Sequence, residues 1–186
     1  VDVFERLNIG VLSTGDELVD DNKKAESFQI YDSNRPMIIS KLQSWGHNTY
    51  DLGIVRDCEE GLKSKIKSSK GKLDLIVTTG GASAGDRDFV SKLLNSEGDL
   101  ILWRVAIKPG RPFAMGFIEG IPIYSLPGNP VAAFVCSLIF LKPSLDLLAG
   151  GTFSEPKSFL VIYLASGGLI SSDRIFQDIF VPESAA

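Results

Sequence analysis

The stretch LDLIVTT, residues 73–79, runs directly into GGASAGDRD, residues 80–88. The first part is a nearly continuous apolar run, which is typical of a strand buried in a parallel sheet. The second part combines glycines, a serine and carboxylates, and a helical pattern begins at Phe89. A buried strand, a glycine-rich turn and a helix in this order indicate an α/β protein, in which ligands bind where the strands end.

Apolar runs and helical patterns alternate on both sides of this stretch. Short apolar runs predict strands at residues 8–13, 49–55, 73–79, 100–107, 113–118 and 121–126. Apolar side chains at helical spacing predict helices that begin near residues 36, 59, 89 and 130. Glu119 and Gly120 separate the last two strands by the two residues of a tight hairpin. The sequence therefore predicts a three-layer α/β/α domain with a mostly parallel, mixed sheet.

The composition excludes several classes of function. The chain has 186 residues and a net charge of −4, and it lacks the clustered basic residues that duplex nucleic acid requires. Two separate cysteines and one histidine argue against a zinc site and a disulfide framework, and favour the cytoplasm. No apolar run reaches the roughly 18 to 20 residues of a membrane span, and no signal pattern precedes the domain. The start at Val1 suggests a piece of a longer protein.

Polar clusters follow the first two predicted strands. STGDEL, residues 13–18, places the carboxylates of Asp16 and Glu17 after a turn that Gly15 permits. IVRD, residues 54–57, places Asp57 at the end of the next strand. Asp57 could bind a metal or a polar ligand, or it could be the N-cap of the following helix. The first cluster could likewise be a simple turn with a capping aspartate.

The glycine-rich turn offers the strongest local evidence for a ligand. Gly80 and Gly81 let the backbone approach a ligand closely, and main-chain N–H groups there could bind an oxyanion. Ser83 adds a hydroxyl, and Asp86 and Asp88 add carboxylates of the kind that Mg²⁺ prefers. The spacing matches neither a Walker A motif nor a Rossmann fingerprint.

A basic strand end and a proline turn complete the set of candidates. Arg104 and Lys108 could bind an anion such as a phosphate or molybdate, or could form a solvated face. The turn consists of Pro127, Gly128, Asn129 and Pro130. Its prolines fix the backbone, and its asparagine could cap the next helix or donate to a ligand.

Other conspicuous residues favour structural interpretations. His47 follows a glycine that can end a helix, so we expect it at the surface. Trp45 and Trp103 have apolar neighbours in the sequence, which predicts core positions. Cys58 and Cys136 lack a neighbouring His or Asp, so we expect inert thiols.

These clusters, in this order, resemble the molybdopterin molybdenumtransferase family, which includes bacterial molybdenum-cofactor enzymes and the E domain of gephyrin. The resemblance covers roughly residues 8–151. The matching stretches are STGDEL (13–18), IYDSN (30–34), LGIVRD (52–57), TTGGASAGDRDF (78–89), AIKPGRPFAMG (106–116) and LPGNPV (126–131).

The resemblance implies a molybdopterin-binding α/β fold and the family reaction, which is Mg²⁺-dependent insertion of molybdate into adenylated molybdopterin with release of AMP. Asp57 and Asp88 would lie at the active site with Mg²⁺, and Glu17 would lie near them. Arg104 and Lys108 would bind anionic groups. The remaining candidates would contact the pterin nucleotide or molybdate, or shape the pocket wall: Gly80, Gly81, Ser83, Pro127, Gly128, Asn129 and Pro130.

The family pattern also predicts what surrounds this domain. We expect residues 1–151 to be the catalytic domain, and residues 152–186 to be an appendage or the truncated start of a C-terminal β-domain. The family implies a homodimer, a partial cleft contributed by a partner subunit, and molybdopterin adenylyltransferase as a candidate protein partner. Three alternatives stay open: a molybdopterin adenylyltransferase, a non-catalytic molybdopterin-binding or scaffold domain, and a nucleotide hydrolase of the competence-damage type.

Overall fold

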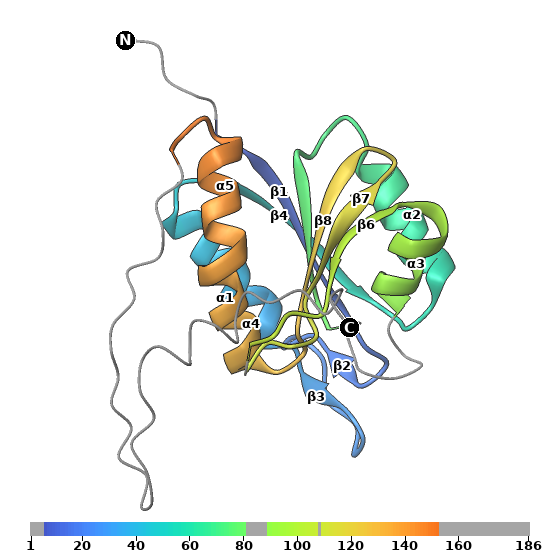
Figure 1. The fold of residues 1–186 in the computed structure, drawn as a ribbon. Helices are drawn as coiled ribbons and strands as arrows, with labels where there is room; N and C mark the ends of the chain where they lie inside the picture. The colour runs from blue at the N-terminus through green and yellow to red at the C-terminus, as the bar shows by residue number, and fades with distance from the viewer. Residues whose placement is uncertain (1–5, 81–88, 108, 153–186) are drawn as a thin grey trace, which may run out of the picture.

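The computed structural model describes residues 6–80, 89–107 and 109–152. They form a six-stranded sheet with the strand order β4-β1-β5-β8-β7-β6, flanked by helices (Figure 1). The strands of this sheet are β1 (Asn8–Thr14), β4 (Asn48–Val55), β5 (Leu75–Thr79), β6 (Asp99–Trp103), β7 (Ala114–Ile118) and β8 (Ile121–Leu126). A separate two-stranded sheet joins β2 (Leu18–Val19) to β3 (Ile30–Tyr31).

Strand pairing confirms the prediction of a mostly parallel, mixed sheet. The pairs β4·β1, β1·β5 and β5·β8 are parallel, whereas β8·β7 and β7·β6 are antiparallel. Only β7 among these six strands therefore runs against the others. The reversal occurs at Glu119 and Gly120, whose φ angles of 55° and 79° suit the tight hairpin predicted there.

Helices cover both faces of the sheet, as Figure 1 shows. One layer contains α1 (Asn34–Ser44), α4 (Pro130–Cys136) and α5 (Lys142–Leu148), and the other contains α2 (Glu59–Ser69) and α3 (Phe89–Glu97). Side chains alternate between the faces of a strand, so each layer packs on its own half of the core. Val11 and Val77 face the first layer, and Leu12 and Ile76 face the second.

The last helix is continuous but irregular. A π-helical turn, η1 (Ser137–Leu141), joins α4 to α5. Pro143 follows this turn. Proline has no N–H to donate to the carbonyl one turn earlier, and its ring crowds that carbonyl, so the regular α-helical hydrogen bond cannot form there. Within the part of the chain that the structure describes, one helix is long and apolar enough to cross a membrane, and it spans Pro130–Leu148. Leu141 and Leu145 are fully buried in the core cluster, as in the core helix of a globular domain.

The two thiols have different environments, and a labelling experiment should separate them. Cys58 is exposed, whereas Cys136 is buried in α4 and donates its S–H to the Gly110 carbonyl at 3.6 Å. Burial raises the pKa of the Cys136 thiol to about 12, so roughly one in ten thousand would be a thiolate at pH 8. A thiol reagent at pH 8 should label one cysteine in the folded chain and two after denaturation, measured by absorbance. Labelling of a folded Cys58→Ser variant at the wild-type rate would contradict the prediction.

Candidate functional site

Strand register brings the carboxyl ends of five strands to one edge of the sheet. Thr14 pairs with Val55, and Thr79 pairs with both Ser13 and Leu126. On the other side, the last residue of β6, Trp103, pairs with Ala114 at the start of β7. The loops that follow β1, β4, β5, β6 and β8 therefore begin along one edge, with neighbouring strands about 4.8 Å apart. We call this the carboxyl edge.

Gly80 is the tightest point at this edge. It has a φ of 80°, and a Cβ atom built on it would lie 2.4 Å from the main-chain oxygen of Thr14. Its N–H donates to the Leu126 carbonyl at 3.2 Å. A Cβ atom built on Gly128, in the proline turn, would lie 3.7 Å from the Gly80 Cα. The turns after β1, β5 and β8 thus meet in backbone contact.

The acidic turn after β1 contacts the turn after β4. The main-chain N–H of Asp57 donates to a carboxylate oxygen of Asp16 at 3.3 Å, and the N–H of Gly15 donates to the Val55 carbonyl at 3.3 Å. Asp57 is half-buried, and Glu17 is exposed in the adjacent turn. The N-cap position of α2 belongs to Cys58 rather than to Asp57, so the capping interpretation of Asp57 is wrong.

The proline turn is fixed from two directions. The Asn129 side chain accepts a hydrogen bond from the Ala132 N–H at 3.1 Å. Asn129 therefore caps α4, which is one of the two roles predicted for it. The Asn34 side chain, at the start of α1, donates to the Gly128 carbonyl at 2.7 Å. Pro127 is buried, whereas Gly128, Asn129 and Pro130 are exposed. The turn therefore presents its backbone at the carboxyl edge.

Arg35 links the segment that contains β2 and β3 to β4 through ion pairs, a role that the sequence did not predict. Its buried guanidinium forms ion pairs with Asp20, with Asp51 at 3.1 Å and with Asp32 at 3.5 Å. Burial lowers the pKa of Arg35, but the hydrogen bond that Arg35 donates to Asp20 and the charges of the three carboxylates outweigh it and raise the pKa overall. The signal available in the sequence was IYDSN, which directly precedes this arginine.

β6 ends at Trp103, and Arg104 follows it at the carboxyl edge. Trp103 is 47% exposed, so the predicted core position is wrong for this tryptophan, whereas Trp45 packs against a core cluster. The guanidinium carbon of Arg104 lies 4.2 Å from the centre of the Trp103 ring. Arg104 has a φ of 58°, and its N–H donates to the Phe113 carbonyl at 2.9 Å.

Buried hydroxyl groups line the sheet beneath this edge. The Ser13 and Thr79 hydroxyls form a hydrogen bond of 2.8 Å on the face covered by α1 and α4. On the opposite face, the hydroxyls of Thr14, Thr78 and Ser125 are buried and have no hydrogen-bond partner among the described residues. Unsatisfied buried hydroxyls are uncommon and typical of positions where water or a ligand completes the bonding.

A family model described as "Probable molybdopterin binding domain" matches residues 10–147. The chain belongs to this molybdopterin-binding domain family. The match includes β1 from residue 10 onward and the whole of the other five strands of the sheet.

Relatives of this molybdopterin-binding domain confirm the resemblance. A molybdopterin molybdenumtransferase from Haemophilus influenzae is 39% identical over 163 residues, which are 87% of this chain and 40% of that protein. One from Staphylococcus aureus is 32% identical over 154 residues, which are 81% of this chain and 36% of that protein. The chain thus spans 40% or less of the length of these two relatives.

Solved structures confirm the predicted α/β fold of the family. A molybdopterin biosynthesis moeA protein from Pyrococcus horikoshii superposes with a TM-score of 0.70 at 29% identity, covering 78% of this chain and 36% of that protein. The tungsten cofactor synthesizing protein MoaB from Pyrococcus furiosus shares the fold with a TM-score of 0.58 at 22% identity. There the match covers 79% of this chain and 98% of the other.

The structure of this molybdopterin-binding domain places the predicted site residues in two groups. Those at the carboxyl edge in the described chain are Glu17, Asp57, Gly80, Arg104, Pro127, Gly128, Asn129 and Pro130. Four others lie outside the described residues: Gly81, Ser83, Asp88 and Lys108. The first group therefore lies along one edge of the sheet, with Asp57 after β4 and Arg104 after β6, the two outermost strands. The roles of all these residues, and the positions of the second group, stay predictions.

The described carboxylates at the carboxyl edge fit a magnesium ion that takes few protein ligands. Within the described ranges, no group of three or more His, Cys, Asp or Glu side chains could hold a metal. Asp57 is one carboxylate at the carboxyl edge, next to the turn of Asp16 and Glu17. Mg²⁺ commonly takes only one or two protein carboxylates and completes its shell with water and substrate phosphates. The described residues fit that mode and do not form an all-protein cage.

Proposed function

We propose that this chain binds a pterin nucleotide at the carboxyl edge and acts in molybdenum-cofactor biosynthesis. The observation that carries the proposal is the contact of separate turns around Gly80, which lies against Thr14 and the proline turn. The acidic side chains of Glu17 and Asp57 and the cationic side chain of Arg104 lie along the same edge, whereas the Gly80 N–H is already bonded to the Leu126 carbonyl. Such an edge can bind an extended ligand that carries a ring system and anionic groups.

The proposed reaction is the insertion of molybdate into adenylated molybdopterin with release of AMP. Mg²⁺ would offset the negative charge that develops as the phosphoanhydride is cleaved. Asp57 and Asp88 would hold the ion, with Glu17 beside them, and Arg104 and Lys108 would bind the phosphates or molybdate. The identity of 39% to a molybdopterin molybdenumtransferase favours this reaction over the other family activities.

The proposed activity is tested by measuring AMP release from adenylated molybdopterin. The chain, supplied with the remaining domains of a relative, is incubated with Mg²⁺ and molybdate, and AMP is measured by chromatography. We expect release that depends on both additions. Synthesis of adenylated molybdopterin from ATP would instead show the adenylyltransferase alternative. Ligand binding with neither activity would show a non-catalytic binding domain.

Assembly and location are also part of the proposal. The family resemblance supports a cytoplasmic homodimer, with molybdopterin adenylyltransferase as the partner that supplies the adenylated substrate. A partner that delivers this ligand would need access to the carboxyl edge, where Gly128, Asn129 and Pro130 are exposed.

A further inference from the structure

We propose that Trp103 and Arg104 form one recognition element, in which the indole stacks on a planar ring of the ligand and the guanidinium binds an anionic group of it. This inference rests on the proposed function and assigns parts of the pterin nucleotide to named side chains. The ligand class is a fused heteroaromatic ring that carries phosphate. The adenine of adenylated molybdopterin belongs to this class, and its pterin offers a second fused heterocycle, of which the pyrimidine ring is planar.

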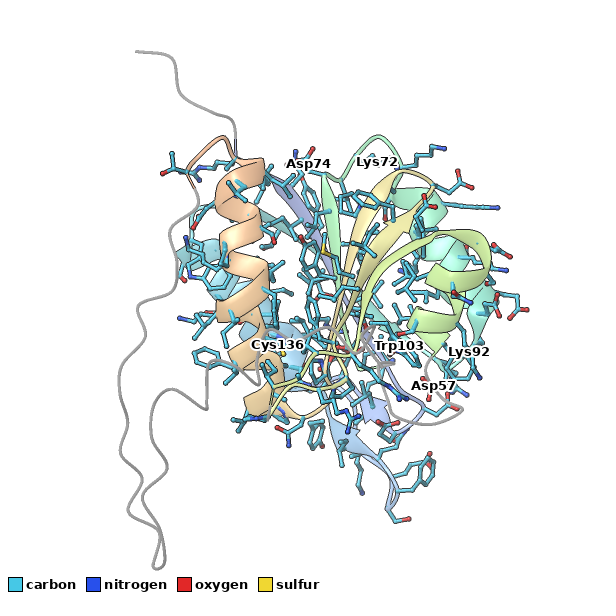
Figure 2. All side chains as sticks on the ribbon, viewed as in Figure 1. Asp57, Lys72, Asp74, Lys92, Trp103 and Cys136 are labelled. Carbon is cyan, nitrogen blue, oxygen red and sulfur yellow. The ribbon has the colours of Figure 1, made fainter. Side chains whose placement is uncertain are left out.

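The first supporting observation is the exposure of a large aromatic side chain at the site. Trp103 is 47% exposed and belongs to neither core cluster. It is the last residue of β6, so it lies where the turns of the site begin. Figure 2 shows Trp103 at the same end of the molecule as Asp57, with Lys72 and Asp74 at the other end. A flat ring that covers this indole would bury a large apolar surface.

The second observation is the strained backbone that holds the cation against the ring. Arg104 has a φ of 58°, a conformation that costs a residue with a side chain about 1 kcal/mol or more. Its N–H still donates to the Phe113 carbonyl at 2.9 Å, which fixes this geometry. The guanidinium carbon lies 4.2 Å from the indole centre. One side of the tryptophan therefore carries a positive charge that can bind phosphate beside a stacked ring.

The third observation is the row of residues that continues from Trp103 across the sheet. Trp103 pairs with Ala114, Ala114 with Ser125, and Ser125 with Thr78, so all four side chains lie on one face. The hydroxyls of Ser125 and Thr78 are buried without a partner among the described residues. The indole thus lies at one end of a row whose buried hydroxyls have no partner among the described residues.

The two tryptophans allow a direct fluorescence test on the full 186-residue chain. Trp45→Phe leaves Trp103 as the only tryptophan, and Trp103→Phe leaves Trp45, which caps the far end of α1 and packs on the core. AMP and a simple pterin are titrated separately into both variants. We expect saturable quenching in Trp45→Phe by at least one ligand, and none in Trp103→Phe after correction for absorbance. The ligand that quenches identifies the stacked ring.

Calorimetry with the same ligand distinguishes stacking from a structural role. Trp103→Ala should weaken binding about five-fold to a hundred-fold, whereas Trp103→Phe should keep most of the affinity because a phenyl ring can still stack. Arg104→Gln should weaken AMP more than adenosine, because the guanidinium binds the phosphate. Wild-type melting temperatures would show that these variants fold.

Three outcomes would overturn the inference. Tight binding of AMP or pterin to Trp103→Ala would place the ring elsewhere and leave the proposed function intact. A change in oligomeric state on Trp103→Ala with unchanged ligand affinity would assign this tryptophan to a subunit interface. Absence of binding to the wild-type chain by calorimetry, for both probes and for adenylated molybdopterin, would refute the inference together with the proposed function.

Discussion

Asp57→Asn is expected to lower Mg²⁺-dependent AMP release on the order of 100-fold. The substitution removes the negative charge of the one predicted metal ligand that the structure places at the carboxyl edge. An amide oxygen binds Mg²⁺ more weakly than a carboxylate, so raising the Mg²⁺ concentration should recover part of the rate. The measurement is the initial rate of AMP formation over a series of Mg²⁺ concentrations.

The variant should fold normally, which makes the rate interpretable. The hydrogen bond from this turn to Asp16 is made by the main-chain N–H of Asp57, and asparagine retains it. The matched control is Asp74→Asn at the opposite end of the molecule (Figure 2). There the new side-chain oxygen can still accept the 2.7 Å bond from the Asn8 N–H. We expect wild-type release from this control. Equal rates for Asp57→Asn and wild type would remove Asp57 from the mechanism.

The order of the helices and of the strands of the six-stranded sheet was predictable because its determinants are local, whereas the short strands β2 and β3 were not predicted. A buried apolar run followed by glycines predicted β5, and two residues of turn type predicted the β7–β8 hairpin. The predicted strand at residues 100–107 nevertheless ends at Trp103, since Arg104 adopts a positive φ and leaves the strand. The convergence of turns was also predictable, because parallel strands place their carboxyl ends at one edge.

The features that the sequence did not predict depend on contacts between segments that are far apart in the chain. Ile101 and Trp103 look like core residues among apolar neighbours, yet they are 61% and 47% exposed because β6 is the edge strand. Strand order depends on which strands pair, and no local pattern encodes it. The ion pairs of Arg35 join residues that are distant in the chain, such as Asp51, so the sequence pattern around the arginine did not reveal them.

Gly80→Ala is expected to destabilise the fold by about 3 kcal/mol, which lowers the melting temperature by about 6 to 12 °C in a chain of this size. Two costs combine. A φ of 80° disfavours any side chain, and the new methyl group would lie 2.4 Å from the main-chain oxygen of Thr14. That oxygen belongs to β1, which is paired on both sides by β4 and β5, so it cannot move without straining β1. Gly80 cannot move away without straining its bond to the Leu126 carbonyl.

Gly71→Ala separates the two costs. Gly71 has a φ of 72°, but a Cβ atom there would meet nothing within 4 Å, so the substitution carries only the backbone cost of about 1 kcal/mol. Thermal unfolding followed by circular dichroism should therefore rank wild type above Gly71→Ala, and Gly71→Ala above Gly80→Ala. Equal losses in the two variants would mean that the turn after β5 does not press against β1. The close contact on which the proposed site depends would then be wrong.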